Sequence, residues 1–163
     1  MYSRIMKLLN DCDSRYPTRE EEETILAYAA SVPQRLQTAA LIEKHEEELV
    51  GASIEGMRWR YARFHSLHDR GWEKSHRDMQ LCLRYAVQGM LVEDVEMPRD
   101  KLFAWLCTIV KGMGMTPQFS RDCYEMLYDN ARKKLPEENF ALVEPYLKPV
   151  SYTHLTLPTN REV

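Results

Sequence analysis

The chain has 163 residues, of which 22 are basic and 25 are acidic, so its net charge at pH 7 is −3. This length allows one domain with a substantial core, and both charge signs are spread along the chain, with no sign of a nucleic-acid surface. No apolar run is long enough to span a membrane, and the first residues lack the apolar core and cleavage site of a signal peptide. We therefore expect a cytoplasmic protein. In that compartment its four cysteines are expected to be reduced and buried, since they have no metal-binding spacing: Cys12, Cys82, Cys107 and Cys123.

The chain is predicted to be all-α, because it contains only six glycines and no alternating strand pattern. A first helix is expected over about residues 2–14, and Tyr16-Pro17 ends it. Thr18 and Glu21 form a capping box that starts a second helix, to about Val32. Pro33 is predicted to begin a third, long helix that ends near Arg63.

The second half of the chain continues this helical pattern. A polar loop is expected from Phe64 to Trp72, followed by a helix from about Glu73 to Glu93. Met97-Pro98 is predicted to start another helix, which the glycines at 112 and 114 end. Thr116-Pro117 caps the next helix, and a last one is expected to end near Leu147. Seven to eight helices result, which would suit a globin-like fold with an N-terminal helical pair.

The last fourteen residues do not look native. The segment 150–159 matches, residue by residue, the translation of a transposase sequencing adapter. We interpret the gene as one assembled from environmental reads, that is, from a metagenome, whose reading frame continues into adapter sequence. Residues 1–149 are therefore taken as the domain and 150–163 as a foreign tail. This removes His154 from the functional candidates.

One segment carries the strongest functional signal: Lys-Ser-His-Arg-Asp-Met-Gln-Leu-Cys-Leu-Arg-Tyr, residues 74–85. It resembles the bilin-attachment segment of phycobiliproteins, the light-harvesting relatives of globins, whose pattern is Cys-x-Arg-Asp and then a helical run ending in Leu-Arg-Tyr. Ser75 stands where that family has its attachment cysteine, while Arg77 and Asp78 match. Since a serine cannot form the thioether, the resemblance implies tetrapyrrole contacts without a covalent bond.

The resemblance extends over roughly residues 5–147, in order. Asp11, Arg15 and Tyr16, followed by a Pro/Thr turn, are similar to the N-terminal segment of allophycocyanin-like subunits. The segment 32–56 resembles the family's long helix, and Gly114 to Pro117 its Gly-Thr-Pro turn. The loop before Ser75 is shorter than in the light-harvesting proteins, and Val92-Glu93-Asp94 replaces Ala-Gly-Asp. These departures favour the phycobiliprotein-like globins encoded beside bilin-making enzymes, the bilin biosynthesis-associated globins.

The resemblance also implies roles for the matching residues. In the family the motif aspartate accepts hydrogen bonds from pyrrole N–H groups, and the arginine binds a propionate. Asp78 and Arg77 suit these roles, because a carboxylate can accept from two N–H donors and a guanidinium binds a carboxylate in a bidentate way. Residues on the same or the adjacent face of the helix complete the predicted binding set: Ser75, His76, Cys82, Arg84 and Tyr85.

Two alternatives remain open for this helix. Arg77 and Asp78 could also be ordinary residues near the start of a helix. The arginine would then be solvated, and the acid would interact favourably with the helix dipole. Cys82 lies two turns from Ser75 on one face and could replace the lost attachment thiol, or it could simply pack in the core.

The histidines permit a haem interpretation. His65, His68 and His76 lie close together in sequence, and imidazole is the usual axial ligand in globins. Loop histidines are also commonly just solvated. Apart from this alternative no metal is expected, since no Cys, His or carboxylate cluster has zinc spacing.

The N-terminal helices are predicted to form a homodimer interface. Asp11 and Arg84 occupy positions that, in the family, pair between two subunits, and Arg15 and Tyr16 are assigned to the same interface. A short apolar helix beside a globin body also needs a surface to bury it. The alternative is that these are surface charges with no partner.

Three functions follow, none of them enzymatic, because no acid–base or nucleophile constellation is present. The first is a globin that holds a bilin non-covalently in bilin biosynthesis or transfer, in contact with bilin-making enzymes. The second is a haem-binding globin. The third is a structural subunit that binds no pigment.

Overall fold

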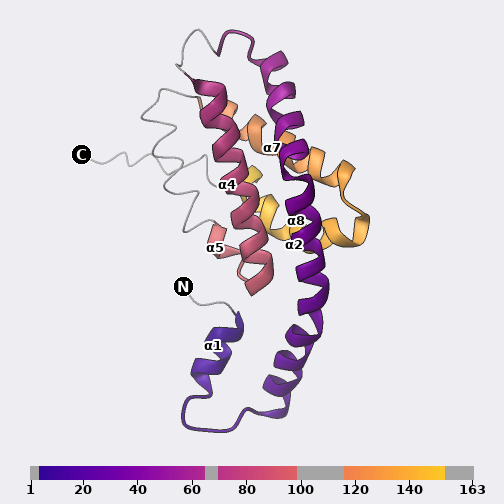
Figure 1. Cartoon of the computed structure of the whole chain (residues 1–163). Helices are drawn as coiled ribbons and strands as arrows, with labels where there is room; N and C mark the ends of the chain where they lie inside the picture. The colour runs from indigo at the N-terminus through magenta and orange to yellow at the C-terminus, as the bar shows by residue number, and fades with distance from the viewer. Residues whose placement is uncertain (1–3, 65–69, 99–115, 153–163) are drawn as a thin grey trace, which may run out of the picture.

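A computed structural model describes residues 4–64, 70–98 and 116–152, and within these ranges every regular element is a helix. The elements are α1 (Arg4–Asp11), α2 (Arg19–Arg60), α4 (Gly71–Val92), α5 (Glu96–Pro98), α7 (Pro117–Lys134) and α8 (Glu137–Tyr152). The long α2 lies beside α4, and α7 and α8 cross behind this pair (Figure 1). The all-α, globin-like architecture predicted from the sequence is confirmed.

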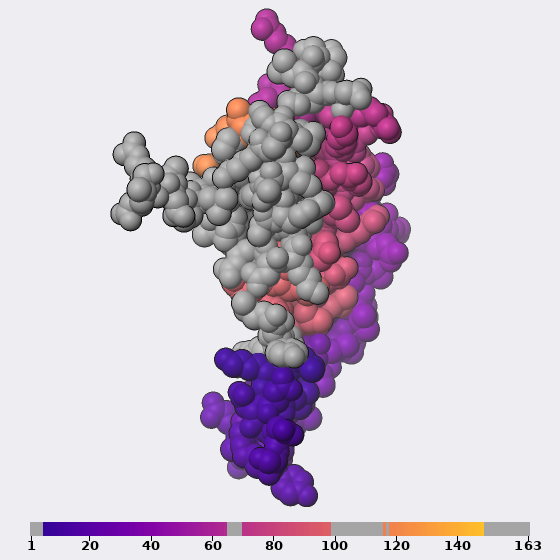
Figure 2. Space-filling view, turned by 90° about the vertical axis from the view of Figure 1, so that its left-hand side faces the viewer, coloured from indigo at the N-terminus to yellow at the C-terminus, as the bar shows by residue number. Residues whose placement is uncertain are grey.

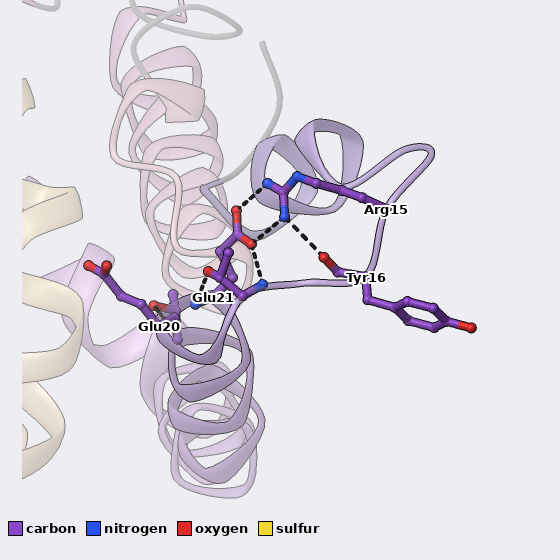
Figure 3. A network of polar contacts seen from close by, with 6 residues as sticks. Arg15, Tyr16, Glu20 and Glu21 are labelled. Atoms are coloured by element: carbon purple, nitrogen blue, oxygen red, sulfur yellow. Dashed lines mark hydrogen bonds and ion pairs between the residues drawn. The ribbon is translucent and has the colours of Figure 1, made fainter.

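The N-terminal pair consists of α1 and the first turns of α2. The chain reverses direction after α1, so the two segments lie side by side (Figure 1). Thr18 caps α2 as predicted: its hydroxyl accepts from the Glu21 amide at 3.4 Å, and the Glu21 carboxylate accepts from the Thr18 amide at 2.7 Å. The same carboxylate accepts two hydrogen bonds from Arg15, at 2.7 and 2.8 Å, which fixes the turn between the helices (Figure 3).

The predicted helix break at Pro33 is wrong, because α2 is one continuous helix of 42 residues. Proline removes one backbone N–H and frees the carbonyl of residue 29. Ala29 and Pro33 are both on the exposed side of α2, where water can satisfy that carbonyl. On either side of Pro33, Tyr28 and Arg35 bond to the end of α4, and these anchors keep the helix axis in place.

The core lies where α2, α4, α7 and α8 meet. Its fully buried side chains are Leu49, Val50, Met57, Leu83, Met90, Leu127 and Val143. The spacing of these positions follows the helical repeat on each segment, which is why the sequence pattern predicted the elements. No described helix is both long and apolar enough to cross a membrane.

Several predicted boundaries differ from those observed. The first helix, expected over about residues 2–14, ends at Asp11, and the long helix expected to end near Arg63 ends at Arg60. The helix expected to start near Glu73 starts at Gly71, because Trp72 packs against Phe64 with ring centroids 4.6 Å apart. The last helix continues to Tyr152, beyond the predicted end at Leu147 and three residues into the predicted adapter-derived tail. The helix expected to start at Met97-Pro98 is described only at its beginning, as α5, and the rest of it lies outside the described residues, as does the tail from 153 to 163.

Candidate functional site

The candidate site is built on α4, whose two sides have different environments. Ser75 and Cys82 face the core, with exposed fractions of 8% and 1%. Asp78 and Tyr85 are half-buried, and Arg77 is exposed. The predicted contacts therefore do not share one surface: Ser75 and Cys82 are turned into the protein, while the charged pair Arg77 and Asp78 lies at the surface.

Arg77 and Asp78 form an ion pair with each other. The Arg77 Nε and Nη2 atoms donate to Asp78 Oδ1 at 3.1 and 2.9 Å. The Asp78 side chain is 21% exposed and the Arg77 side chain 65%. Both hydrogen bonds to Asp78 within the described residues go to Oδ1, and none goes to Oδ2.

Cys82 lies between this pair and α7. Its sulfur bonds to the hydroxyl of Tyr124 at 3.5 Å. Burial raises the pKa of the Cys82 thiol to about 12, and the negative charge of Asp78 adds to the rise. Burial also raises the pKa of Cys123 on α7. Because the thiolate is the nucleophile, Cys82 is chemically suited to packing and poorly suited to pigment attachment.

His76 is turned away from Asp78, towards α2. Its Nε2 atom lies 3.1 Å from Oε1 of Glu47, and Gln80 donates to the other oxygen of Glu47 at 3.3 Å. The structure therefore does not bring His76 together with the Arg77–Asp78 pair. The other two histidines of the haem interpretation, His65 and His68, lie outside the described residues. Among the residues that are described, no three His, Cys, Asp or Glu side chains gather to hold a metal ion.

The side chains assigned to a subunit interface are either exposed or hydrogen-bonded to other residues of the same chain. Arg84 donates to Glu46 of α2 through two hydrogen bonds, of 2.8 and 2.7 Å. Arg15 is bound to Glu21, while Tyr16 is 94% exposed and Asp11 is also exposed. Figure 2 shows the N-terminal residues gathered at one end of the molecule.

The sequence analysis missed a buried carboxylate at the other end of α2. Asp122 is 5% exposed and accepts from Tyr61 at 2.6 Å and from Gln118 at 2.7 Å, and its Oδ2 atom lies 3.1 Å from Arg60. Burial alone would raise the pKa of Asp122, but these partners outweigh it and the pKa is lowered. Tyr61 and Asp122 are 61 residues apart, and no local pattern in the sequence connects them.

The sequence of the chain matches the model of a known protein family. The model described as phycobilisome protein matches residues 8–152. The chain belongs to this family. A comparison with curated proteins found no match. Phycobiliproteins carry bilin chromophores, so the family assignment makes α4, which holds the predicted bilin contacts, the first candidate for a binding site.

Proposed function

We propose that this phycobilisome-family chain is a non-enzymatic globin that binds a linear tetrapyrrole, a bilin, without a covalent bond. The observation that carries the proposal is the Arg77–Asp78 pair at the surface of α4, on which the described thiol, Cys82, is buried with a raised pKa. A pigment held in this way can leave, which suits bilin biosynthesis or transfer in the cytoplasm better than light harvesting. Bilin-making enzymes are the partners we propose.

The described residues fit such a ligand. Asp78 has one oxygen that accepts no hydrogen bond within the described residues, and Arg77 is exposed enough to turn towards a ligand carboxylate. Arg77 would then bind a propionate, and Asp78 would accept from pyrrole N–H groups and favour the protonated pigment. The described thiols support non-covalent binding, because the pKa values of Cys12, Cys82 and Cys123 are all raised.

Titration of the purified chain with a bilin tests this proposal. Asp78→Asn keeps the shape of the side chain and removes its charge, so it should weaken binding about tenfold or more, since hydrogen bonds to charged groups contribute roughly 1.5–3 kcal/mol. It should also shift the long-wavelength band, because the protonated pigment loses its counter-charge. Glu138→Gln, the same kind of charge removal at an exposed position of α8, is the control. Equal affinities and spectra for all three proteins would refute the assignment of Asp78.

The homodimer remains part of the proposal. Apolar side chains are exposed on the N-terminal pair and farther along α2: Met6, Leu9, Leu26 and Leu36 are each 46–67% exposed. A groove of about 480 Å³ lies between α2 and α4 and is lined by Leu36, Val87 and Arg84 among others. A second copy that placed its N-terminal helices on this groove would cover apolar surface on both chains.

Two variants test the dimer. Arg84→Glu should weaken it, but this change also breaks the bond to Glu46. Leu36→Glu avoids that complication, because Leu36 is 55% exposed and its replacement disturbs only the surface. Lys44→Glu, at an exposed position outside the groove, is the control. If light scattering finds the same mass for Leu36→Glu and Arg84→Glu as for the unmodified dimer, the interface lies elsewhere.

A further inference from the structure

At one end of the molecule, where α2 ends and α4 begins, basic side chains gather (Figure 1). The segments 58–64 and 70–77 hold six exposed basic residues and one acidic residue, Glu73, although the net charge of the whole chain is −3. Phe64 and Trp72 join the two segments, with ring centroids 4.6 Å apart. The residues of this basic surface are Arg58, Arg60, Arg63, Arg70, Lys74 and Arg77.

Two arginines of the basic surface are held in place by other side chains. The guanidinium of Arg58 lies 5.9 Å from the centre of the Trp72 ring. An Nη atom of Arg60 lies 3.1 Å from Oδ2 of the buried Asp122, and the Arg60 side chain is still 55% exposed. Cations that are already positioned lose less conformational freedom when a partner binds. Both arginines are therefore accessible and prepared for an anionic group.

Trp59 stands between these two arginines and is 85% exposed. Successive residues of a helix point about 100° apart. Arg58 is directed to Trp72 on α4 and Arg60 to Asp122 on α7, so Trp59 points away from the core. Tryptophan and arginine are the residue types most enriched among those that dominate binding between proteins. This combination favours a protein partner.

A second groove, of about 620 Å³, continues from Trp59 along α2 and is lined by Gly51, Ile54 and Ala62 among others. A Cβ atom at Gly51 would meet nothing within 4 Å, so the backbone of α2 is open to close approach at this point. Gly51, Glu55, Trp59 and Ala62 follow at intervals of three and four residues, which places them on one face of α2. A helix lying along this face would contact the groove and the basic surface together.

We propose that the basic surface and this groove bind an acidic amphipathic helix of a partner protein. Its carboxylates would lie against Arg58 and Arg63, and an apolar side chain would lie on Gly51 beside Trp59. Glu47 and Glu55 line the other part of the groove. They repel carboxylates there, so the partner helix is acidic at the end near Arg63 and carries a cation at its other end.

An acidic helix fits this surface better than nucleic acid or an anionic membrane. The exposed Glu47 and Glu48 lie about 15 Å along α2 from Arg58. An extended polyanion that covered the basic surface would also meet these carboxylates and be repelled by them. A helix whose carboxylates are confined to one end avoids this repulsion.

The experiment uses the full chain and a labelled helical peptide with leucines along one face, glutamates at one end and a lysine at the other. Binding is followed by fluorescence anisotropy. A second peptide has glutamines in place of the glutamates, and a DNA duplex and vesicles containing phosphatidylserine are titrated in parallel. We expect saturable binding of the acidic peptide that weakens as salt is added, and affinity for the glutamine peptide that is lower by about tenfold or more.

Variants of the chain locate the binding. Arg58→Glu and Trp59→Ala should each weaken binding of the acidic peptide by about tenfold or more. Lys133→Glu, the same kind of charge reversal at an exposed position of α7, is the control and should bind like the unmodified chain. Trp59→Ala keeps the test valid should Arg58→Glu fold poorly, because the Trp59 side chain is 85% exposed.

The proposal is overturned if the acidic peptide does not bind, if both peptides bind equally, or if Arg58→Glu and Trp59→Ala bind like Lys133→Glu. Tighter binding of the DNA duplex or the vesicles than of the peptide, lost in Arg58→Glu, would also overturn it, because the surface would then recognise a polyanion. No pigment is present in the experiment, so its outcome is independent of the proposed bilin site.

Discussion

Arg35 of α2 forms an ion pair with Glu93, the residue at which α4 ends. Glu93 has a left-handed backbone, with φ of 52°. A non-glycine residue in this conformation costs roughly 1–2 kcal/mol. The guanidinium of Arg35, whose side chain is 9% exposed, also donates to the carbonyl of Met90. The ion pair therefore stabilises the strained backbone of Glu93 and connects the middle of α2 to the C-terminal end of α4.

Glu93→Gly tests this relationship. The change relieves the backbone strain, but it leaves the buried guanidinium without its carboxylate, and removing one partner of a buried pair costs about 3–5 kcal/mol. We expect a net loss of roughly 2 kcal/mol in the free energy of unfolding, measured by urea denaturation. Arg19→Gln, which breaks the exposed Arg19–Glu23 pair, should change stability little. A Glu93→Gly protein more stable than the unmodified chain would show that strain outweighs the ion pair.

The glycines provide a second prediction. Gly51→Ala should raise the free energy of unfolding by about 0.5–1 kcal/mol, because the new methyl group meets no atom and the helix gains from alanine. Gly89→Ala should lower it by about 1–3 kcal/mol, since its Cβ would come within 3.0 Å of Pro98 and Tyr146. Thermal and urea denaturation of the two variants give the comparison. A destabilised Gly51→Ala would mean that the space beside Gly51 is filled.

The hydrogen bond between Tyr61 and the buried Asp122 makes the free energy of unfolding depend on pH in the alkaline range. Burial and the hydrogen bond to Asp122 raise the pKa of Tyr61 from 10.0 to about 12. A group whose pKa is higher in the folded than in the unfolded chain contributes its full stabilisation at pH values below the pKa of the unfolded chain. We therefore expect this contribution at neutral pH and its loss as the pH rises from about 10 to about 12.

Tyr61→Phe removes that contribution. It should cost about 1–3 kcal/mol at pH 7, because the buried carboxylate loses a donor, and the variant should show a shallower decline above pH 10. Urea denaturation at a series of pH values provides the curves. Tyr16→Phe, at a ring that is 94% exposed, should follow the unmodified protein. Parallel curves for Tyr61→Phe and the unmodified chain would argue against the coupling.

Cys82 should be unreactive in the folded protein. It is 1% exposed and its pKa is raised to about 12, so the thiolate is scarce and inaccessible. Iodoacetamide at pH 8, followed by mass spectrometry of peptides, should label Cys82 only after unfolding. Cys82→Ala should retain bilin binding. A bilin found attached to the Cys82 peptide would instead make this residue the replacement for the missing attachment cysteine.

The sequence predicted the helical fold well because apolar spacing, the capping box at Thr18 and the cap at Thr116 are local signals. Pro33 was misinterpreted for the opposite reason: α2 continues through it, and the contacts of Tyr28 and Arg35 on either side reach residues more than fifty positions away. Local periodicity placed Ser75, Asp78 and Cys82 on one face, yet the core lies against part of that face and takes Ser75 and Cys82 into it.

The remaining contacts of the site depend on long-range packing in the same way. Arg84 was assigned to a partner subunit from the family resemblance, and within the chain it is bound to Glu46. His76 was grouped with the loop histidines by sequence proximity, and its observed contact is Glu47 on α2. The burial of Asp122 was not predicted: its contact with Gln118 is local to α7, but its bond to Tyr61 forms only when the end of α2 packs against α7.

The central claim is that the chain holds a bilin without a covalent bond. The most direct test is an absorbance spectrum of the protein purified from cells that make both haem and a bilin, recorded before and after denaturation in acidic urea. We predict a long-wavelength band in the native protein and a pigment that separates from the unfolded chain, with less pigment on Asp78→Ala. A pigment that stays on the unfolded chain, a sharp blue haem band in place of the bilin band, or a colourless protein would each contradict the claim.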